Sequence, residues 1–237
     1  MNFFDIKVNI LPKIDPKCFS ISESMERLKE IRSHDISKIC AVPFAFDIKN
    51  QNPSKILIEI RKEASKILNF NIPELNYAAE YPINYYYSSP GDLDTINNTK
   101  YLMLKFPSFD FPLNLSEILN RFNNQGFIVI INNLESNILF RKYFSPEILI
   151  ENNCLLNVDI SKVFLSKKSP QIPFLKFLYE KKLITTLSGF SSKLNDGVIE
   201  TIKRFSYFTG INHEKILNDF MWKNPNIIIS STKWESN

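Results

Sequence analysis

The sequence predicts an α/β protein built as a single distorted (β/α)7 barrel, with an open doubly wound sheet as the alternative. Two observations predict this fold class. Short apolar runs of the kind that form buried strands alternate about seven times with amphipathic helical segments. No linker rich in proline, glycine or serine interrupts this alternation in the middle of the 237-residue chain. Such alternation implies parallel strands joined by right-handed crossovers, and a barrel of this kind gathers its chemistry at the carboxyl ends of the strands.

Each predicted strand is a short segment rich in apolar residues. Residues 4–11 alternate apolar and polar side chains before Pro12, and residues 37–43 form an apolar run that ends at a proline. The remaining runs, such as FIVIIN and LITTL, are apolar almost throughout, as strands buried on both faces are. The predicted strands span residues 4–11, 37–43, 75–81, 100–106, 127–132, 155–158 and 183–187.

Apolar residues at helical spacing identify the segments between the strands. Ser20 and Glu23 form a capping-box pattern, and Met25, Leu28 and Ile31 then recur on one face of the helix that follows. The predicted helices span residues 23–33, 53–69, 115–124, 145–152, 174–181, 196–208 and 214–220. We expect a single domain over residues 1–237, with a barrel core at about 1–195 and a closing helical segment at about 196–237.

Composition excludes several classes of protein. The net charge of +4 is spread along the chain without a basic run, so a nucleic-acid partner is not expected. The three cysteines, Cys18, Cys40 and Cys154, have no metal-binding spacing and suit neither a disulfide framework nor a zinc site. Reduced cysteines, the lack of a signal-peptide pattern and the lack of a long apolar window predict a cytoplasmic protein without membrane insertion.

An opening segment and six further segments, in order, resemble motifs of one superfamily. The opening DIKVNILPKID is similar to the DxHxHxLPGxDDG opening of the polymerase and histidinol phosphatase (PHP) superfamily, and SISESMERLKEI resembles the helix that follows. KICAVPF, NYAAEYPI, YLMLKF, GFIVIINNLESN and LITTLSGFSS resemble its later strand-end motifs. The resemblance covers about residues 3–192. Within the superfamily, the segments look most like the bacterial capsular-polysaccharide tyrosine phosphatases. It implies a PHP-type barrel.

The resemblance also implies which residues occupy the family's metal site. Family members bind two or three divalent metals, such as manganese, through histidines and carboxylates at the strand ends. Glu80 is the only aligned ligand that keeps its type, and Ser136 replaces the arginine that would hold phosphate. Asp15 and Glu135 are retained acidic residues with either a site or a structural role. The aligned ligand positions that differ are Lys7, Asn9, Phe44, Lys105, Asn133, Gly189 and Ser191.

These substitutions predict a cleft that has lost its metals. A protonated lysine repels a metal ion, and Phe and Gly offer no lone pair, so no cofactor is expected. The chain has only two histidines, His34 and His213, and both fall at helix boundaries that are expected to lie on the surface. We therefore expect a pseudo-phosphatase without catalytic residues. We also expect Glu80 to form an ion pair with Lys7 or Lys105 in place of a metal.

Alternatives remain open from the sequence. Lys7, Lys105 and Glu80 could be solvent-facing residues, and residual metal-dependent tyrosine phosphatase activity could persist. Lys7 and Lys105, with Tyr85 and Tyr86 beside them, could instead bind a phosphate or phosphopeptide without hydrolysis. The tyrosines at 81, 85, 86 and 87 form either a binding surface or a packed cap. The expected partner is another protein, such as a tyrosine kinase or a component of polysaccharide export.

Overall fold

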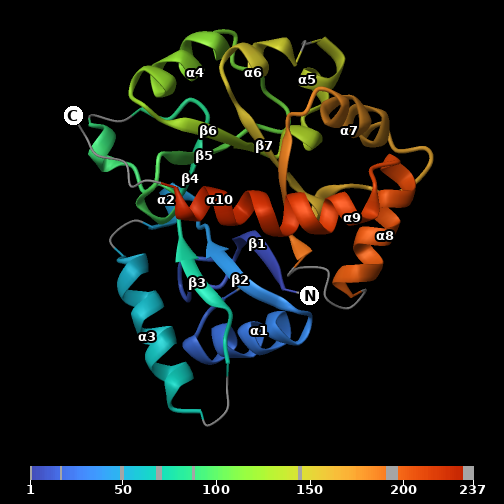
Figure 1. Cartoon of the computed structure of the whole chain (residues 1–237). Coiled ribbons are helices and arrows are strands. Elements are labelled where there is room, and N and C mark those ends of the chain that lie inside the picture. Colours follow the sequence, from blue (N-terminus) through green and yellow to red (C-terminus); the bar gives the residue numbers. More distant parts are fainter. Residues whose placement is uncertain are drawn as a thin grey trace.

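A computed structural model shows an α/β protein whose strands are all parallel to their neighbours (Figure 1). The structure describes residues 2–16, 18–48, 51–67, 71–86, 89–143, 146–190 and 197–231. The strands are β1 (Phe3–Val8), β2 (Ile36–Ala41), β3 (Glu74–Tyr77), β4 (Glu80–Pro82), β5 (Tyr101–Lys105), β6 (Ile128–Asn132), β7 (Leu155–Asp159) and β8 (Ile184–Ser188). This result confirms the predicted α/β class with parallel strands.

The helices lie outside the strands (Figure 1), and short helices at residues 45–48, 138–143 and 224–230 add to those that the sequence predicts. They are α1 (Ile21–Ser33), α2 (Ala45–Ile48), α3 (Pro53–Ser65), α4 (Leu115–Asn124), α5 (Ile138–Tyr143), α6 (Glu147–Glu151), α7 (Gln171–Glu180), α8 (Val198–Thr209), α9 (His213–Lys215) and α10 (Asn224–Ser230). The predicted cap of α1 is present, because the Ser20 side chain accepts a hydrogen bond from the Glu23 N–H over 3.2 Å. The Glu23 carboxylate in turn accepts one from the Phe19 N–H over 2.6 Å.

The strand predicted over residues 75–81 is in fact two strands, β3 and β4, which belong to different sheets. The chain changes partner at two consecutive alanines. The Ala78 N–H donates to the Ala41 carbonyl at 3.1 Å, whereas the Ala79 N–H donates to the Asp94 carbonyl at 3.1 Å. Hydrophobic periodicity does not reveal this break, since the residues on both sides of it are largely apolar and buried.

Among the described residues, the strands form two sheets with no closed hydrogen-bonded ring. One sheet has the order β1-β2-β3 and the other β4-β5-β6-β7-β8. An isolated parallel bridge between Phe44 and Glu80 links the end of β2 to β4, and β1 packs beside β8. The parallel strands of the predicted (β/α)7 barrel are therefore present, whereas its closed hydrogen-bonded ring is not found among the described residues.

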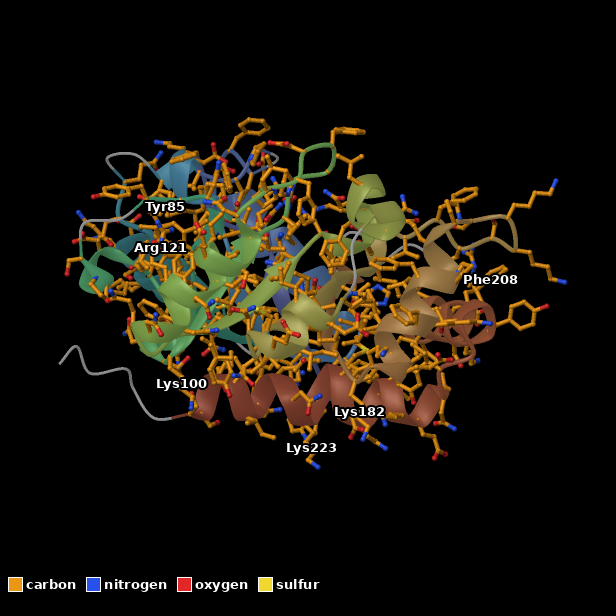
Figure 2. The ribbon with its side chains drawn as sticks, turned by 90° about the horizontal axis from the view of Figure 1, so that it is seen from above. Tyr85, Lys100, Arg121, Lys182, Phe208 and Lys223 are labelled. Carbon is orange, nitrogen blue, oxygen red and sulfur yellow. The ribbon has the colours of Figure 1, made fainter. Side chains whose placement is uncertain are left out.

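A compact apolar cluster fills the space between the two sheets. Its buried members come from the four strands β1, β2, β5 and β6, from the segments that follow β2 and β3 and precede β5, and from the C-terminal helix. They include Phe4, Ile6, Cys40, Met103, Ile130, Ile228 and Ile229. The last two belong to α10, which continues a π-helical segment, Ile216–Lys223. Figure 1 shows this helix crossing both sheets, and Figure 2 shows Lys223 pointing away from the protein. One end of the strands is thus covered, and the site lies at the other.

None of the helices in the described ranges is long and apolar enough to cross a lipid bilayer.

Candidate functional site

A cavity of about 650 Å³ opens where the strands end. Its walls come from the carboxyl ends of β1, β5 and β7, from β4, from the segments after β1, β2, β7 and β8, and from α1 and α2. The predicted site residues that line it are Lys7, Asn9, Asp15, Phe44, Glu80, Lys105 and Gly189. Most of the residues that the motifs place at strand ends therefore lie around one cavity.

The other predicted residues lie beside or outside this cavity. Asn133 and Glu135 are buried behind it, in the turn after β6, and Ser136 follows them without lining the cavity. Tyr85 is partly buried and Tyr86 is exposed, and neither lines the cavity. Ser191 and Tyr87 fall outside the described residues.

Lys7 and Glu80 form an ion pair in the cavity floor. Their side chains are only 11% and 5% exposed, so the pair is shielded from solvent. The same Glu80 oxygen accepts a hydrogen bond from the Asn132 amide at 2.8 Å. The predicted pairing of Glu80 with a lysine is confirmed, and Lys7 is the partner. The carboxylate expected to survive from the metal site is occupied by an ammonium group.

Behind this pair, a chain of polar side chains crosses the ends of β6, β7 and β8. The Asn157 amide donates to Asn132 at 2.9 Å and to the Ser188 hydroxyl at 2.8 Å. The Thr186 hydroxyl donates to the Asn157 carbonyl oxygen at 2.9 Å. All four side chains are buried. They satisfy one another's hydrogen bonds, which is what buried polar groups need.

Gly189 leaves room for a carboxylate at the end of β7. A Cβ atom placed on Gly189 would lie 2.1 Å from Oδ1 of Asp159, and the glycine has φ = +82°. Asp159 accepts hydrogen bonds from the Ser161 N–H at 3.1 Å and forms an ion pair with Lys162 at 3.3 Å. Lys162 also donates to the Asn133 side-chain oxygen. Asp159 and Lys162 therefore lie against Gly189 and Asn133, two positions that the resemblance aligns with metal ligands.

Lys105 differs from the other lysines of the cavity. Its ammonium lies 4.7 Å from the centroid of the Phe44 ring, a cation–π distance. Within the described residues it takes part in no salt bridge. The alternative pairing of Glu80 with Lys105 is thus not the one formed.

Two buried carboxyl groups have raised pKa values. Burial raises the pKa of Asp15 to about 6, although the Leu11 N–H, which donates to Asp15 at 2.6 Å, opposes the shift. Burial, with the neighbouring Asp159 charge, raises the pKa of Glu135 to about 8. Oε1 of Glu135 has no hydrogen-bond partner in the described structure. Glu135 is therefore mostly a neutral acid at pH 7.

Comparison with known proteins decides the family. The family of capsular polysaccharide synthesis proteins CpsB/CapC matches residues 3–230. This chain belongs to the CpsB/CapC family. The resemblance inferred from the strand-end motifs is confirmed.

Individual CpsB/CapC relatives show how far the likeness extends. The protein named "Putative tyrosine-protein phosphatase CapC" from Staphylococcus aureus is 26% identical over 140 residues, which are 56% of this chain and 54% of that one. The match therefore spans about half the length of that relative. The crystal structures of YwqE from Bacillus subtilis and CpsB from Streptococcus pneumoniae, metal-dependent tyrosine phosphatases, include a chain that superposes with a TM-score of 0.76. That match is 19% identical, covers 98% of this chain and 96% of the other, and shows a common fold.

The donor chemistry of the cavity does not suit the divalent metals of CpsB-type phosphatases. The Glu80 carboxylate already binds Lys7 and Asn132, the Asn133 oxygen binds Lys162, and Phe44 has no donor atom. Among the described residues, no three His, Cys, Asp or Glu side chains are grouped as metal ligands would be. Neither histidine lines the cavity, and His34 and His213 are partly buried at helix ends instead of lying on the open surface as expected.

Sequence reasoning missed several residues that shape this CpsB/CapC cavity. Asp5 is fully buried and accepts a hydrogen bond from the Gly189 N–H at 3.2 Å. The other missed residues are Asn132, Asn157, Asp159, Lys162, Thr186 and Ser188. A signal was present for most of them, since a polar residue at the inward position of an apolar strand needs a buried partner.

Proposed function

We propose that this chain is a non-hydrolysing CpsB/CapC protein, a pseudo-phosphatase that acts by binding or scaffolding another protein. The observation that carries the proposal is the shielded ion pair of Lys7 with Glu80. A cation occupies the one aligned ligand that retains its type. Without a metal there is no metal-activated hydroxide to attack a phosphoryl group and no Lewis acid to stabilise the transition state.

The supporting observations come from the rest of the cavity. Lys162 neutralises Asp159, and Lys105 presents a second ammonium group where the resemblance expects a glutamate. Each lysine adds a positive charge where a metal-binding site needs a ligand. Partial repair of such a site is not expected to restore the chemistry, because metal ligands act as a set.

The setting of this function is proposed from the family. Its members are described as proteins of capsular polysaccharide synthesis, so a tyrosine kinase or a component of polysaccharide export is the proposed partner, in the cytoplasm. We also propose that the strands form the ring of a PHP-type (β/α)7 barrel. The bridge from Phe44 to Glu80 and the packing of β1 beside β8 support this closure.

The ion pair of Lys7 with Glu80 bears on both alternatives, the residual phosphatase and the non-hydrolysing phosphate binder. Residual metal-dependent phosphatase activity would need Glu80 to release Lys7. A phosphate site built on both Lys7 and Lys105 would need Lys7 to leave Glu80 as well. The pairing therefore weighs against both alternatives.

Hydrolysis of a phosphotyrosine peptide tests the proposal. The purified protein is assayed with and without added manganese, next to CpsB from Streptococcus pneumoniae as the positive control. The expected result is no manganese-dependent release of phosphate above the no-protein control. Manganese-dependent turnover by this protein that exceeds the control would overturn the pseudo-phosphatase function.

A further inference from the structure

One lysine of the cavity is available to a ligand. Lys7 is paired with Glu80, and Lys162 is paired with Asp159. Lys105 lies over the Phe44 ring and, in the part of the chain that the structure describes, has no carboxylate partner. Its side chain is partly exposed and lines the cavity. A cation–π contact leaves its ammonium group able to donate hydrogen bonds.

An aromatic wall of four contacting rings begins at Phe44, the ring under this lysine, and continues beyond the cavity lining. The ring centroids of Phe44 and Phe46 are 5.4 Å apart, those of Phe46 and Tyr85 are 5.7 Å apart, and those of Tyr85 and Tyr81 are 4.7 Å apart. Phe46 is 58% exposed, which is unusual for a phenylalanine that already packs against two rings. The wall therefore presents one exposed ring, Phe46, in contact with the Phe44 ring that lies under the Lys105 ammonium.

This aromatic wall is held from behind. The Arg121 guanidinium donates a hydrogen bond to the Tyr85 carbonyl at 2.7 Å, and Figure 2 shows the two residues next to each other. The Tyr81 hydroxyl accepts a hydrogen bond from the Asp94 N–H at 2.8 Å. A wall fixed in this way loses little freedom when a ligand packs on it, which favours binding.

The charge of the cavity selects the kind of anion. Its lining holds four cations, at Lys7, Arg27, Lys105 and Lys162, against the five carboxyl groups of Asp15, Glu30, Asp47, Glu80 and Asp159. A phosphate monoester carries close to two negative charges at neutral pH, so this excess of carboxylates repels it about twice as strongly as it repels a singly charged anion. A carboxylate carries one negative charge, which a single ammonium group can neutralise.

We infer that Lys105 and the aromatic wall bind a monocarboxylate carried on an aromatic or apolar group. In a partner protein, an acidic residue or a terminal carboxylate next to an aromatic side chain would present this chemistry. The inference rests on the proposed function, because it gives the binding cavity its ligand class. It also replaces the phosphopeptide alternative with a singly charged ligand.

Calorimetric titration with three small probes at pH 7 tests the ligand class. N-acetylphenylalanine has the ring and the carboxylate, its amide lacks the charge, and N-acetylphosphotyrosine carries a dianion. The carboxylate is expected to bind, with the amide roughly tenfold weaker, as the loss of one charge-assisted hydrogen bond predicts. The phosphotyrosine probe is expected to bind no better than the carboxylate. Tighter binding of phosphotyrosine, or no binding of the carboxylate, would overturn the inference.

Two variants locate the site. Lys105→Met should weaken N-acetylphenylalanine binding roughly tenfold and leave the affinity for the amide unchanged. Lys38→Met is the matched control, because Lys38 also lies over an aromatic ring, Trp222 at 5.9 Å, but does not line the cavity. Equal binding by wild type and Lys105→Met, with both proteins folded by circular dichroism, contradicts the assignment. Manganese-dependent hydrolysis would instead refute the proposed function, so the two failures are distinguishable.

Discussion

Lys7, at the carboxyl end of β1, and Glu80, the first residue of β4, form an ion pair between the two sheets. They are 73 positions apart in the sequence. Each side chain is largely removed from solvent, and Asn132 provides a further hydrogen bond to the carboxylate at 2.8 Å. A pair in this environment neutralises two charges that would each be costly to bury alone.

Glu80→Gln is expected to destabilise the protein by about 3–5 kcal/mol, because Lys7 then keeps a poorly solvated charge without its counterion. Chemical denaturation at pH 7 measures the loss. A double variant, Lys7→Met with Glu80→Gln, should recover part of the stability, since it removes both charges. A Glu80→Gln protein that unfolds at the same denaturant concentration as wild type would show that the pair is not buried in solution.

Restoring two histidines should not restore an enzyme. Lys7→His combined with Asn9→His is expected to leave manganese-dependent phosphatase activity at background, because Phe44, Lys105 and Gly189 still supply no ligand. The assay is release of phosphate from a phosphotyrosine peptide. A clear gain of turnover in this double variant would mean that the aligned positions are not the ones that matter.

Gly189→Ala should be strongly destabilising. Its Cβ would lie 2.1 Å from Asp159, at a φ of +82° that L-residues rarely adopt. Gly197→Ala is a matched control, since Gly197 has φ = +74° but no atom within 4 Å of the added Cβ. The control should cost about 1 kcal/mol from backbone strain alone, and Gly189→Ala at least about 2 kcal/mol more. Equal losses in thermal stability would show that Asp159 moves aside freely.

Glu135 should make the protein less stable as the pH rises. Its pKa is raised from 4.5 to about 8, so between these values the folded state binds a proton that the unfolded state has released. The free energy of unfolding should therefore fall with increasing pH over this window, by on the order of 3–5 kcal/mol. Glu135→Gln should remove that part of the pH dependence in denaturation curves measured from pH 4.5 to 8. An unchanged pH profile in the variant would contradict the buried acid.

Much of the fold could be predicted from the sequence because the strands are short apolar runs between amphipathic helices. The segment over residues 75–81 could not be divided correctly, since the change of hydrogen-bond partner from β2 at Ala78 to the Asp94 carbonyl at Ala79 leaves no mark on hydrophobic periodicity. The last predicted helix, over residues 214–220, ends before α10, whose position across both sheets depends on contacts of Ile228 and Ile229 with the interior cluster. Contacts of this kind arise only from the folded arrangement.

The sequence predicted which residues lie at the candidate site more fully than it predicted which side chains contact one another there. Motif order located Lys7, Phe44, Glu80, Lys105 and Gly189 at one cavity. It did not show that Asp159 fills the space beside Gly189, because the two residues come from different strands and meet only through a glycine that lacks a side chain. It also did not separate Lys7 from Lys105 as the partner of Glu80, since strand ends give position without side-chain direction.

Metal content tests the central claim most directly. The protein is purified without chelators, incubated with excess manganese, passed through a desalting column and analysed by elemental mass spectrometry, with CpsB from Streptococcus pneumoniae treated in parallel. The account predicts far less than one bound manganese, iron or zinc ion per chain of this protein. Stoichiometric metal that is retained after desalting, and lost when Glu80 is replaced by Gln, would contradict it.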